Sequence, residues 1–253
     1  ILSDTYPGIE LNMAFFGRRV SITNEFLIIG NGDGSDSSAE QGAWMFNKNH
    51  GGTDNWGLFK SFTYPGSNDG SSTTFNDEQF GFSSSIDGDY IVICANQGRA
   101  YDSGSSSFIA CGMAFVYYRH QGGRNNWGLQ QKLFPQTTNG DNDFVADTRF
   151  GGRSNIKGKY IVISGSNRDT DSLTDVGAIY IYYRTGNTWA IQQRILPDSP
   201  IEDELFGNAT LSPNQVYCIA SSRGADKILV YKRTGTSWSL FNTLVATTTI
   251  TGF

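Results

Sequence analysis

One loop of the sequence places oxygen-bearing side chains at the spacing of a cation site. In "SGSNRDTDSLTDVGA", Asn167, Asp169, Asp171 and Asp175 occupy positions 1, 3, 5 and 9 of a loop. Amide and carboxylate oxygens at this spacing can wrap around Ca²⁺, although Ser172 stands where glycine is usual. The pattern predicts a calcium site, with a solvated acidic loop as the alternative. A weaker version of this loop lies earlier in the chain and contains Asp33, Asp36 and Glu40.

Other groups that could do chemistry are sparse. His50 and His120 are the two histidines, and both occupy equivalent turn positions of different repeats, so we expect turn residues rather than a shared site. The sequence contains no Gly-x-Ser-x-Gly, His-Glu-x-x-His or phosphate-binding Gly-Lys motif. Carboxylates are plentiful in loops, but no pair of them points to a glycosidase. The sequence therefore predicts a protein that is not an enzyme.

Two of the three cysteines flank a long loop. Cys94 ends one predicted strand and Cys111 begins the next, and antiparallel neighbours bring such positions close. The spacing predicts a disulfide that closes the loop, with two free thiols as the alternative. Cys218 lies within a predicted strand and is interpreted as a small buried hydrophobe.

A segment of about fifteen residues that begins with Phe-Gly recurs along the chain and indicates how these loops are positioned. "FGRRVSITNEFLIIG" begins at Phe16, "FGFSSSIDGDYIVIC" at Phe80 and "FGGRSNIKGKYIVIS" at Phe150, and a shortened form, "FGNATLSPNQVYCIA", begins at Phe206. Alternating and continuous apolar positions in these stretches are typical of strands. We expect the four phenylalanines to be buried.

Each copy continues with two further strands. The last of them carries one tryptophan, at Trp56, Trp127, Trp189 and Trp238, and a tight polar turn such as "TGNT" precedes it. An aromatic at one position of every repeat indicates packing between neighbouring sheets. The alternative is a ring of exposed platforms on which sugar rings stack.

Each unit therefore holds about four short strands and no helix. A four-stranded sheet of this size cannot bury both faces alone, and the closed radial solution is a β-propeller. We predict an all-β protein, a single propeller of four antiparallel repeats. The predicted repeats span approximately residues 1–62, 63–134, 135–196 and 197–253.

The repeat also resembles a known family. The pattern "FG…SI…GDYIVI.A…G.A.VY.R.G..W.LQQKL" is similar to the FG-GAP repeat of integrin-type and many bacterial and protist extracellular propellers. That resemblance implies an extracellular or cell-surface location and supports a calcium loop at residues 167–175. The sequence departs from the family in having four units, where more are usual, and in replacing "GAP" by "CAN", "SGS" and "IAS".

Composition excludes two classes of partner. The formal net charge is −5 and the pI is about 5.0, so no basic face is available for nucleic acid. Apolar runs such as "EFLIIG" are far shorter than the roughly 20 residues of a membrane-spanning helix. We therefore expect neither nucleic-acid binding nor membrane insertion.

The function expected from these patterns is a non-enzymatic extracellular propeller that makes structural or protein–protein contacts. Its partners would be other copies of itself or surface proteins, assembled as an oligomer or filament. The uncharged tail "LVATTTITGF" could add to a sheet edge, or complete a sheet of its own chain. The alternative function is carbohydrate binding, with glycans as ligands.

Overall fold

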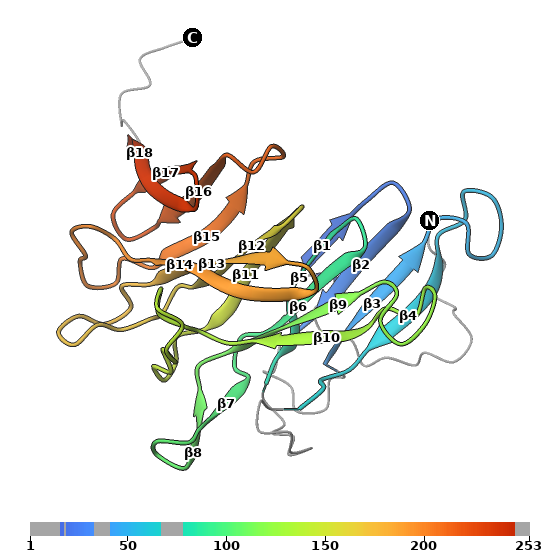
Figure 1. Cartoon of the computed structure of the whole chain (residues 1–253), viewed down its shortest axis with the longest axis horizontal. Coiled ribbons are helices and arrows are strands. Elements are labelled where there is room, and N and C mark those ends of the chain that lie inside the picture. The colour runs from blue at the N-terminus through green and yellow to red at the C-terminus, as the bar shows by residue number, and fades with distance from the viewer. Residues whose placement is uncertain (1–15, 18, 33–40, 67–77, 246–253) are drawn as a thin grey trace, which may run out of the picture.

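The computed structural model describes residues 16–17, 19–32, 41–66 and 78–245. In these residues every regular element is a β-strand, and the predicted all-β architecture is confirmed (Figure 1). No helix long and apolar enough to cross a membrane occurs in the described part of the chain. Residues 33–40, with the weaker acidic loop, and residues 246–253, with most of the tail, lie outside it.

The strands form four antiparallel sheets of four strands. The first sheet, here sheet 1, contains β1 (Arg19–Ile22), β2 (Phe26–Asn31), β3 (Gly42–Asn47) and β4 (Gly57–Phe62). Sheet 2 contains β5 (Phe80–Asp87), β6 (Tyr90–Ala95), β9 (Met113–Tyr118) and β10 (Gly128–Leu133). A separate hairpin, inserted between β6 and β9, contains β7 (Arg99–Asp102) and β8 (Ser107–Ala110).

The second half of the chain repeats the arrangement without an inserted hairpin. Sheet 3 contains β11 (Phe150–Lys157), β12 (Tyr160–Gly165), β13 (Ala178–Thr185) and β14 (Thr188–Ile195). Sheet 4 contains β15 (Phe206–Leu211), β16 (Tyr217–Ser222), β17 (Lys227–Thr234) and β18 (Ser237–Val245).

Successive sheets pack face to face, with their first strands innermost. Strand β5 contacts β1 and β2, β11 contacts β5 and β6, and β15 contacts β11 and β12. Sheets 1 and 4 do not pack on each other in this way among the described residues, and they lie on opposite sides of the molecule in Figure 1. The described sheets therefore form an open arc of propeller blades.

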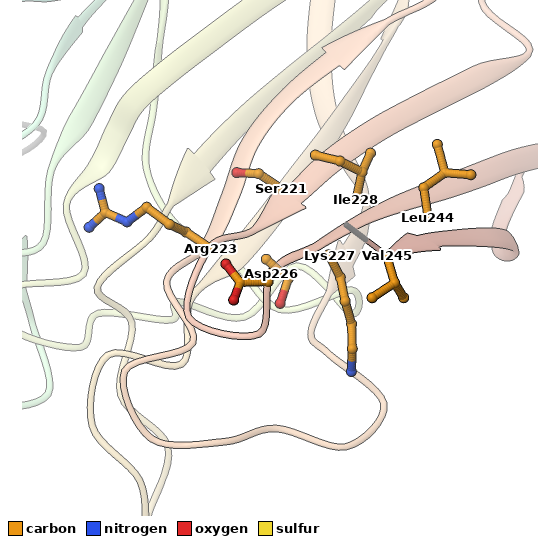
Figure 2. A pocket seen from close by; sticks show the side chains of 8 residues that line it. Ser221, Arg223, Asp226, Lys227, Ile228, Leu244 and Val245 are labelled. Atoms are coloured by element: carbon orange, nitrogen blue, oxygen red, sulfur yellow. The ribbon is translucent and has the colours of Figure 1, made fainter. Parts of the chain in front are cut away.

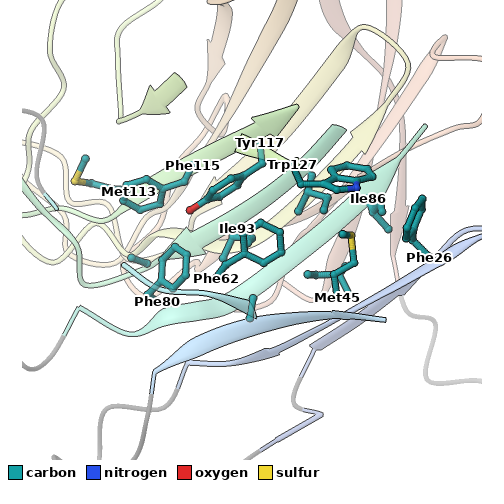
Figure 3. Packing of buried hydrophobic residues seen from close by; sticks show 14 residues of the cluster. Phe26, Met45, Phe62, Phe80, Ile86, Ile93, Met113, Phe115, Tyr117 and Trp127 are labelled. Carbon is teal, nitrogen blue, oxygen red and sulfur yellow. The ribbon is translucent and has the colours of Figure 1, made fainter. Parts of the chain in front are cut away.

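The continuous apolar strands explain why the sheets stack. Strand β6 is buried along its whole length, with Ile91 and Ile93 facing sheet 1 and Val92 and Cys94 facing sheet 3. Each interior sheet thus has two apolar faces, and each face must be covered. Figure 3 shows the first junction, where Phe26, Met45 and Phe62 of sheet 1 pack against the aromatic residues of sheet 2.

An arginine stacks across each of the three junctions. The Arg184 guanidinium lies 4.4 Å from the ring centroid of Tyr90 in the preceding sheet and 5.7 Å from that of Trp189 in its own sheet. Cation–π contacts of this kind contribute about 0.5–2 kcal/mol each. The same arrangement joins Phe26 to Trp127 through Arg119, and Tyr160 to Trp238 through Arg233.

A glutamine on the fourth strand of one sheet forms two hydrogen bonds with the backbone of the tryptophan in the next sheet. The Trp189 amide donates to Gln131 Oε1 at 2.8 Å, and Gln131 Nε2 donates to the Trp189 carbonyl at 2.6 Å. Gln193 and Trp238 repeat this pair. Trp127, Trp189 and Trp238 are 0–3% exposed and Trp56 is half-buried, so packing is their role and the predicted alternative of exposed platforms is wrong for these three.

Glycine opens the third strand because the next sheet approaches it closely. Gly177 has φ +90°, and a Cβ atom there would lie 2.2 Å from the Phe206 carbonyl oxygen. Gly112, with φ +91°, has the same relation to Phe150. The amides of Phe150 and Phe206 each donate to a carbonyl in this segment, so the backbones are hydrogen-bonded where they meet.

The predicted burial of the repeated phenylalanines is confirmed at three positions and wrong at one. Phe80, Phe150 and Phe206 are 0% exposed, whereas Phe16 is 41% exposed. Each buried phenylalanine lies between its own sheet and the one before it. Phe16 is exposed because no described sheet precedes sheet 1.

Truncation of Phe150 tests this difference. We expect Phe150→Ala to lower the free energy of unfolding by about 3–5 kcal/mol, because it leaves a cavity between sheets 2 and 3. Phe16→Ala is the matched control and should cost less than about 1 kcal/mol. Urea unfolding followed by tryptophan fluorescence measures both, and equal losses for the two variants would contradict the packing described here.

Candidate functional site

The axial edge of the sheets gathers polar residues from three blades and β1. In an antiparallel pair the start of one strand lies beside the end of the next, so residues at the start of a first strand meet those that follow a second strand. Because the first strands are innermost, these edges converge near the axis of the arc. A pocket of about 380 Å³ opens there, large enough for a small organic ligand.

Four arginines give this axial pocket its charge. Arg19 begins β1, Arg149 and Arg153 lie at the start of β11, and Arg223 follows β16. None of the described residues that line the pocket is an aspartate or glutamate. Guanidinium groups bind carboxylate and phosphate groups through paired hydrogen bonds. The pocket therefore concentrates positive charge in a protein whose net charge is −5.

Two asparagine side chains supply hydrogen-bond acceptors to the pocket. Asn96, which follows β6, is 3% exposed, and its Oδ1 atom has no hydrogen-bond partner among the described protein atoms. Asn208 of β15 is exposed, and its Oδ1 accepts a hydrogen bond from Arg153 Nε at 3.3 Å. A buried carbonyl oxygen without a partner favours a ligand that donates a hydrogen bond.

Charge and amide groups together suit an anion that also carries hydroxyl groups. The arginines provide donors for the anionic group, and Asn96 Oδ1 provides an acceptor for a hydroxyl or a water molecule. The sequence analysis missed this site. Its signal is positional, since Arg153 and Arg19 both stand three residues after the phenylalanine of their Phe-Gly pair.

The predicted calcium loop is divided between two environments. Asn167 lines the axial pocket, whereas the Asp169 carboxylate accepts a hydrogen bond from the Asp175 amide at 2.8 Å and Asp171 is exposed. The described residues contain no group of three or more histidine, cysteine, aspartate or glutamate side chains placed to hold a metal ion. Calcium binding by this loop stays a prediction.

The same loop contributes to a buried ion-pair network. Arg168 donates to both oxygens of Asp143, at 2.8 and 2.9 Å, and Arg194 lies 2.8 Å from Asp143 Oδ1. Tyr180 completes the shell with a hydroxyl donor at 2.9 Å. Burial alone would raise the pKa of Asp143, but the hydrogen bonds and charges of the two arginines outweigh it and lower the pKa to about 2. This network anchors the loop to sheet 3.

The predicted Cys94–Cys111 disulfide is not present in this structure. Both residues are buried free thiols, and the strand partner of Cys94 is Ala114. The inserted hairpin β7–β8 occupies the loop between the cysteines, and Cys111 lies before the start of β9 rather than opposite Cys94. Burial raises the pKa of Cys94 to about 11 and that of Cys111 to about 12, so both thiols stay protonated near neutral pH.

The two histidines pack locally on different sheets. His50 contacts the ring of Phe59 edge-on at 5.7 Å. His120 contacts Tyr118 in the same manner, and its Nδ1 accepts a hydrogen bond from the Asn125 amide at 3.3 Å. Neither residue lines the axial pocket.

Known proteins share the fold of this chain but little of its sequence. No family model and no curated protein matches it. Solved structures that match include a candidate 6-phosphogluconolactonase from Bacteroides fragilis (TM-score 0.55, 11% identity), another from Bacteroides uniformis (0.52, 13%) and the periplasmic gluconolactonase PpgL of Pseudomonas aeruginosa (0.50, 9%). The matches cover 92, 94 and 92% of this chain and 57, 60 and 58% of those chains, respectively. The chain thus spans somewhat more than half the length of these structures.

These comparisons correct two predictions. The FG-GAP resemblance is wrong as a family assignment, because no such model matches and the three solved structures named above, which share the fold, carry lactonase names. The expected non-enzymatic structural or carbohydrate-binding function is also wrong, because those structures carry the names of lactonases. A Phe-Gly strand paired with an apolar strand suits the packing of propeller blades in general. This shared packing requirement explains why the sequence resembles the FG-GAP repeat.

The ion-pair network predicts a pH dependence of stability. The pKa of Asp143 is lowered from 3.8 to about 2 on folding, so its contribution is complete above pH 4 and is lost as the pH falls toward 2. We expect a loss of about 2 kcal/mol from this group between pH 5 and pH 2, measured by urea unfolding.

Asp143→Asn should remove that component and flatten the curve. Asp141→Asn, two residues away at an exposed position, is the control and should keep the slope of the unmodified protein. The same slope for all three proteins would show that Asp143 does not act in this way.

The calcium prediction has its own test. If the 167–175 loop binds Ca²⁺, adding calcium after chelator treatment should raise the melting temperature, because a ligand of the folded state stabilises it. Asp171→Asn should abolish this effect without disturbing the Asp169–Asp175 hydrogen bond. A melting temperature that is independent of calcium in the unmodified protein would reject the site.

Proposed function

We propose that this propeller hydrolyses a sugar lactone that carries an anionic group, and that the axial pocket is its active site. The observation that supports this most strongly is the set of four arginines around a pocket whose described lining includes no carboxylate. Three solved structures of this fold with lactonase names support the class of reaction. The arginines support the choice of an anionic substrate.

Binding would place the anionic group against the exposed guanidinium groups. Arg153 and Arg223 are exposed at the pocket mouth, where a phosphate or carboxylate could reach both. Arg153 is already oriented by its hydrogen bond to Asn208. A paired charge-assisted hydrogen bond is stronger than a neutral one, and it also fixes the orientation of the ligand.

The half-buried arginines would serve the reacting ester. Water adds to the lactone carbonyl carbon, and the carbonyl oxygen becomes negatively charged in the tetrahedral intermediate. A guanidinium such as that of Arg149 can stabilise this oxyanion. The acyl–oxygen bond then breaks, the ring oxygen takes a proton, and the product is a hydroxy acid whose carboxylic acid group ionises and releases one proton to solvent.

Asn96 would orient the attacking water. Its unpartnered Oδ1 can accept a hydrogen bond from a water molecule, which leaves a lone pair of the water oxygen directed at the ester. An amide does not remove a proton, so this role is positional, and solvent takes up the proton.

Location belongs to the same proposal. One structure with this fold is named as a periplasmic enzyme, which is compatible with a place in the cell envelope or outside the cell. An extracellular or cell-surface position is the narrower form of this proposal.

Proton release tests the activity. We expect the protein to hydrolyse 6-phosphogluconolactone above the spontaneous rate, and glucono-δ-lactone more slowly, in a weakly buffered assay with a pH indicator. Arg153→Ala and Arg223→Ala should each reduce kcat/KM for the phosphorylated substrate by about tenfold or more, since one charged hydrogen bond is worth about 1.5–3 kcal/mol.

Arg124→Ala is the matched control, because this exposed arginine lies in a loop of sheet 2 and does not line the pocket. It should retain full activity. Spontaneous rates with both lactones, or equal activity of the Arg153→Ala and Arg124→Ala variants, would contradict the proposal.

A further inference from the structure

Asn208 in β15 has an unusual backbone conformation for a strand residue. Its φ is +50°, and in the described part of the chain it is the one residue other than glycine with a positive φ inside a strand. Asparagine accepts this left-handed conformation more readily than most residues, but it normally does so in turns. Residues that the surrounding structure holds in such conformations cluster at functional sites, and Asn208 lines the axial pocket.

The conformation of Asn208 arises from a shift in the irregularity of the first strand. In β5 and β11 the pairing with the next strand is interrupted directly after the phenylalanine, at Gly81 and Gly151, which have φ +93° and +97°. In β15 the interruption falls one residue later, after Gly207, and the left-handed residue is Asn208. A bulge re-aims the side chain that it carries. Sheet 4 therefore has an amide where the left-handed residues of sheets 2 and 3 have no side chain.

The amide of Asn208 reaches across the junction to sheet 3. Arg153 Nε, on β11, donates a hydrogen bond to Asn208 Oδ1 at 3.3 Å. Among the described residues, the Arg153 side chain has no other hydrogen-bond partner, forms no ion pair and stacks on no ring. The terminal nitrogens Nη1 and Nη2 of Arg153 are therefore available to a ligand.

A similar contact in sheet 2 serves packing alone. Asn125, in the turn between β9 and β10, has φ +57°, and its Oδ1 accepts a hydrogen bond from Arg119 Nε at 2.8 Å. The terminal nitrogens of Arg119 donate to both oxygens of Glu25, and its guanidinium stacks at the junction of sheets 1 and 2. All the donors of Arg119 are thus used within the protein, whereas Arg153 is held by an asparagine and keeps its terminal donors free.

A second guanidinium lines the same pocket. Figure 2 shows the Arg223 side chain pointing away from Ile228 and Leu244, which are exposed on the face of sheet 4 turned away from sheet 3. Arg153 and Arg223 carry like charges, and none of the described lining residues is a carboxylate that could offset their repulsion. An anion bound between them would offset it.

We propose, on the basis of the proposed function, that Asn208 is the positioning residue that makes the axial pocket specific for anionic substrates. By holding Arg153 Nε, it directs Nη1 and Nη2 together at the anionic group, as a fork that matches two oxygens of a phosphate or carboxylate. An arginine that is already ordered loses less conformational entropy when the ligand binds, so the affinity is higher. Asn208 contacts the guanidinium and not the reacting ester, so it acts on binding.

Binding of 6-phosphogluconate, the product expected from 6-phosphogluconolactone, tests this role without relying on catalysis. In isothermal titration calorimetry, Asn208→Gly should bind it about fivefold more weakly than the unmodified protein, because a free arginine must be ordered on binding. Glycine accepts a positive φ without strain, so this variant should fold normally, as far-ultraviolet circular dichroism can verify. Asn125→Gly is the matched control, since it removes a left-handed asparagine with the same contact outside the pocket, and it should keep the affinity of the unmodified protein.

A double variant identifies the route of the effect. Asn208→Gly should weaken binding little further when Arg153→Ala is already present, because the amide acts by holding that guanidinium. In the kinetic assay Asn208→Gly should raise KM for 6-phosphogluconolactone by about fivefold and change kcat less, since it removes binding that is equal in the ground state and the transition state.

Failure of this role and failure of the proposed function give different results. Equal affinity of Asn208→Gly and the unmodified protein, or fully additive effects of Asn208→Gly and Arg153→Ala, would overturn the role of Asn208 whether or not the lactone is hydrolysed. No binding of 6-phosphogluconate by the unmodified protein would overturn it as well. Binding that depends on Asn208 and Arg153 in a protein that hydrolyses neither lactone would support the role of Asn208 and refute the proposed reaction.

Discussion

Burial of both faces of every sheet is the constraint on which this structure depends. A sheet of four short strands has too little apolar contact within itself to be stable, and it gains stability by covering its neighbours. Strands such as β6 and β12 are buried at every position because they are covered on both sides. The residues that repeat along the chain are those that meet at these covered faces. The packing of sheet on sheet therefore determines where the other features of the molecule lie.

The junctions combine apolar packing with a few directional contacts. Apolar faces alone would allow neighbouring sheets to slide, whereas the arginine stacked between an aromatic ring and a tryptophan holds one position. The glutamine that grips the tryptophan backbone fixes the same position a second time. Glycine at the start of β13 lets the backbones come within hydrogen-bonding distance on the axial side. These contacts set the angle between blades and thereby the place where their inner edges converge.

The repeats differ from one another at the axial edge. The position three residues after each phenylalanine is Arg19, Ser83, Arg153 and Ala209 in the four sheets. Arg19 and Arg153 line the axial pocket, whereas Ser83 donates a hydrogen bond to the Gly151 carbonyl of sheet 3 and Ala209 is buried between sheets 3 and 4. A rigid scaffold with a variable rim is a common way for propellers to carry different sites. In this chain the rim is basic, although the molecule as a whole is acidic.

The sequence by itself determined the fold class, the four-strand repeat and the packing role of three tryptophans and three phenylalanines. These follow from local periodicity and recurrence, which a chain displays without being folded. It did not determine the axial pocket, because Asn96, Arg153 and Arg223 come from three different repeats and become neighbours only when the inner edges converge. It also misplaced the cysteines, because an inserted hairpin changed which residue lies opposite Cys94. The exposure of Phe16 depends on there being no described sheet before sheet 1, which no local pattern records. Tertiary structure decided these points because each depends on what another sheet brings to a residue, and the residue's own position in the repeat does not contain that information.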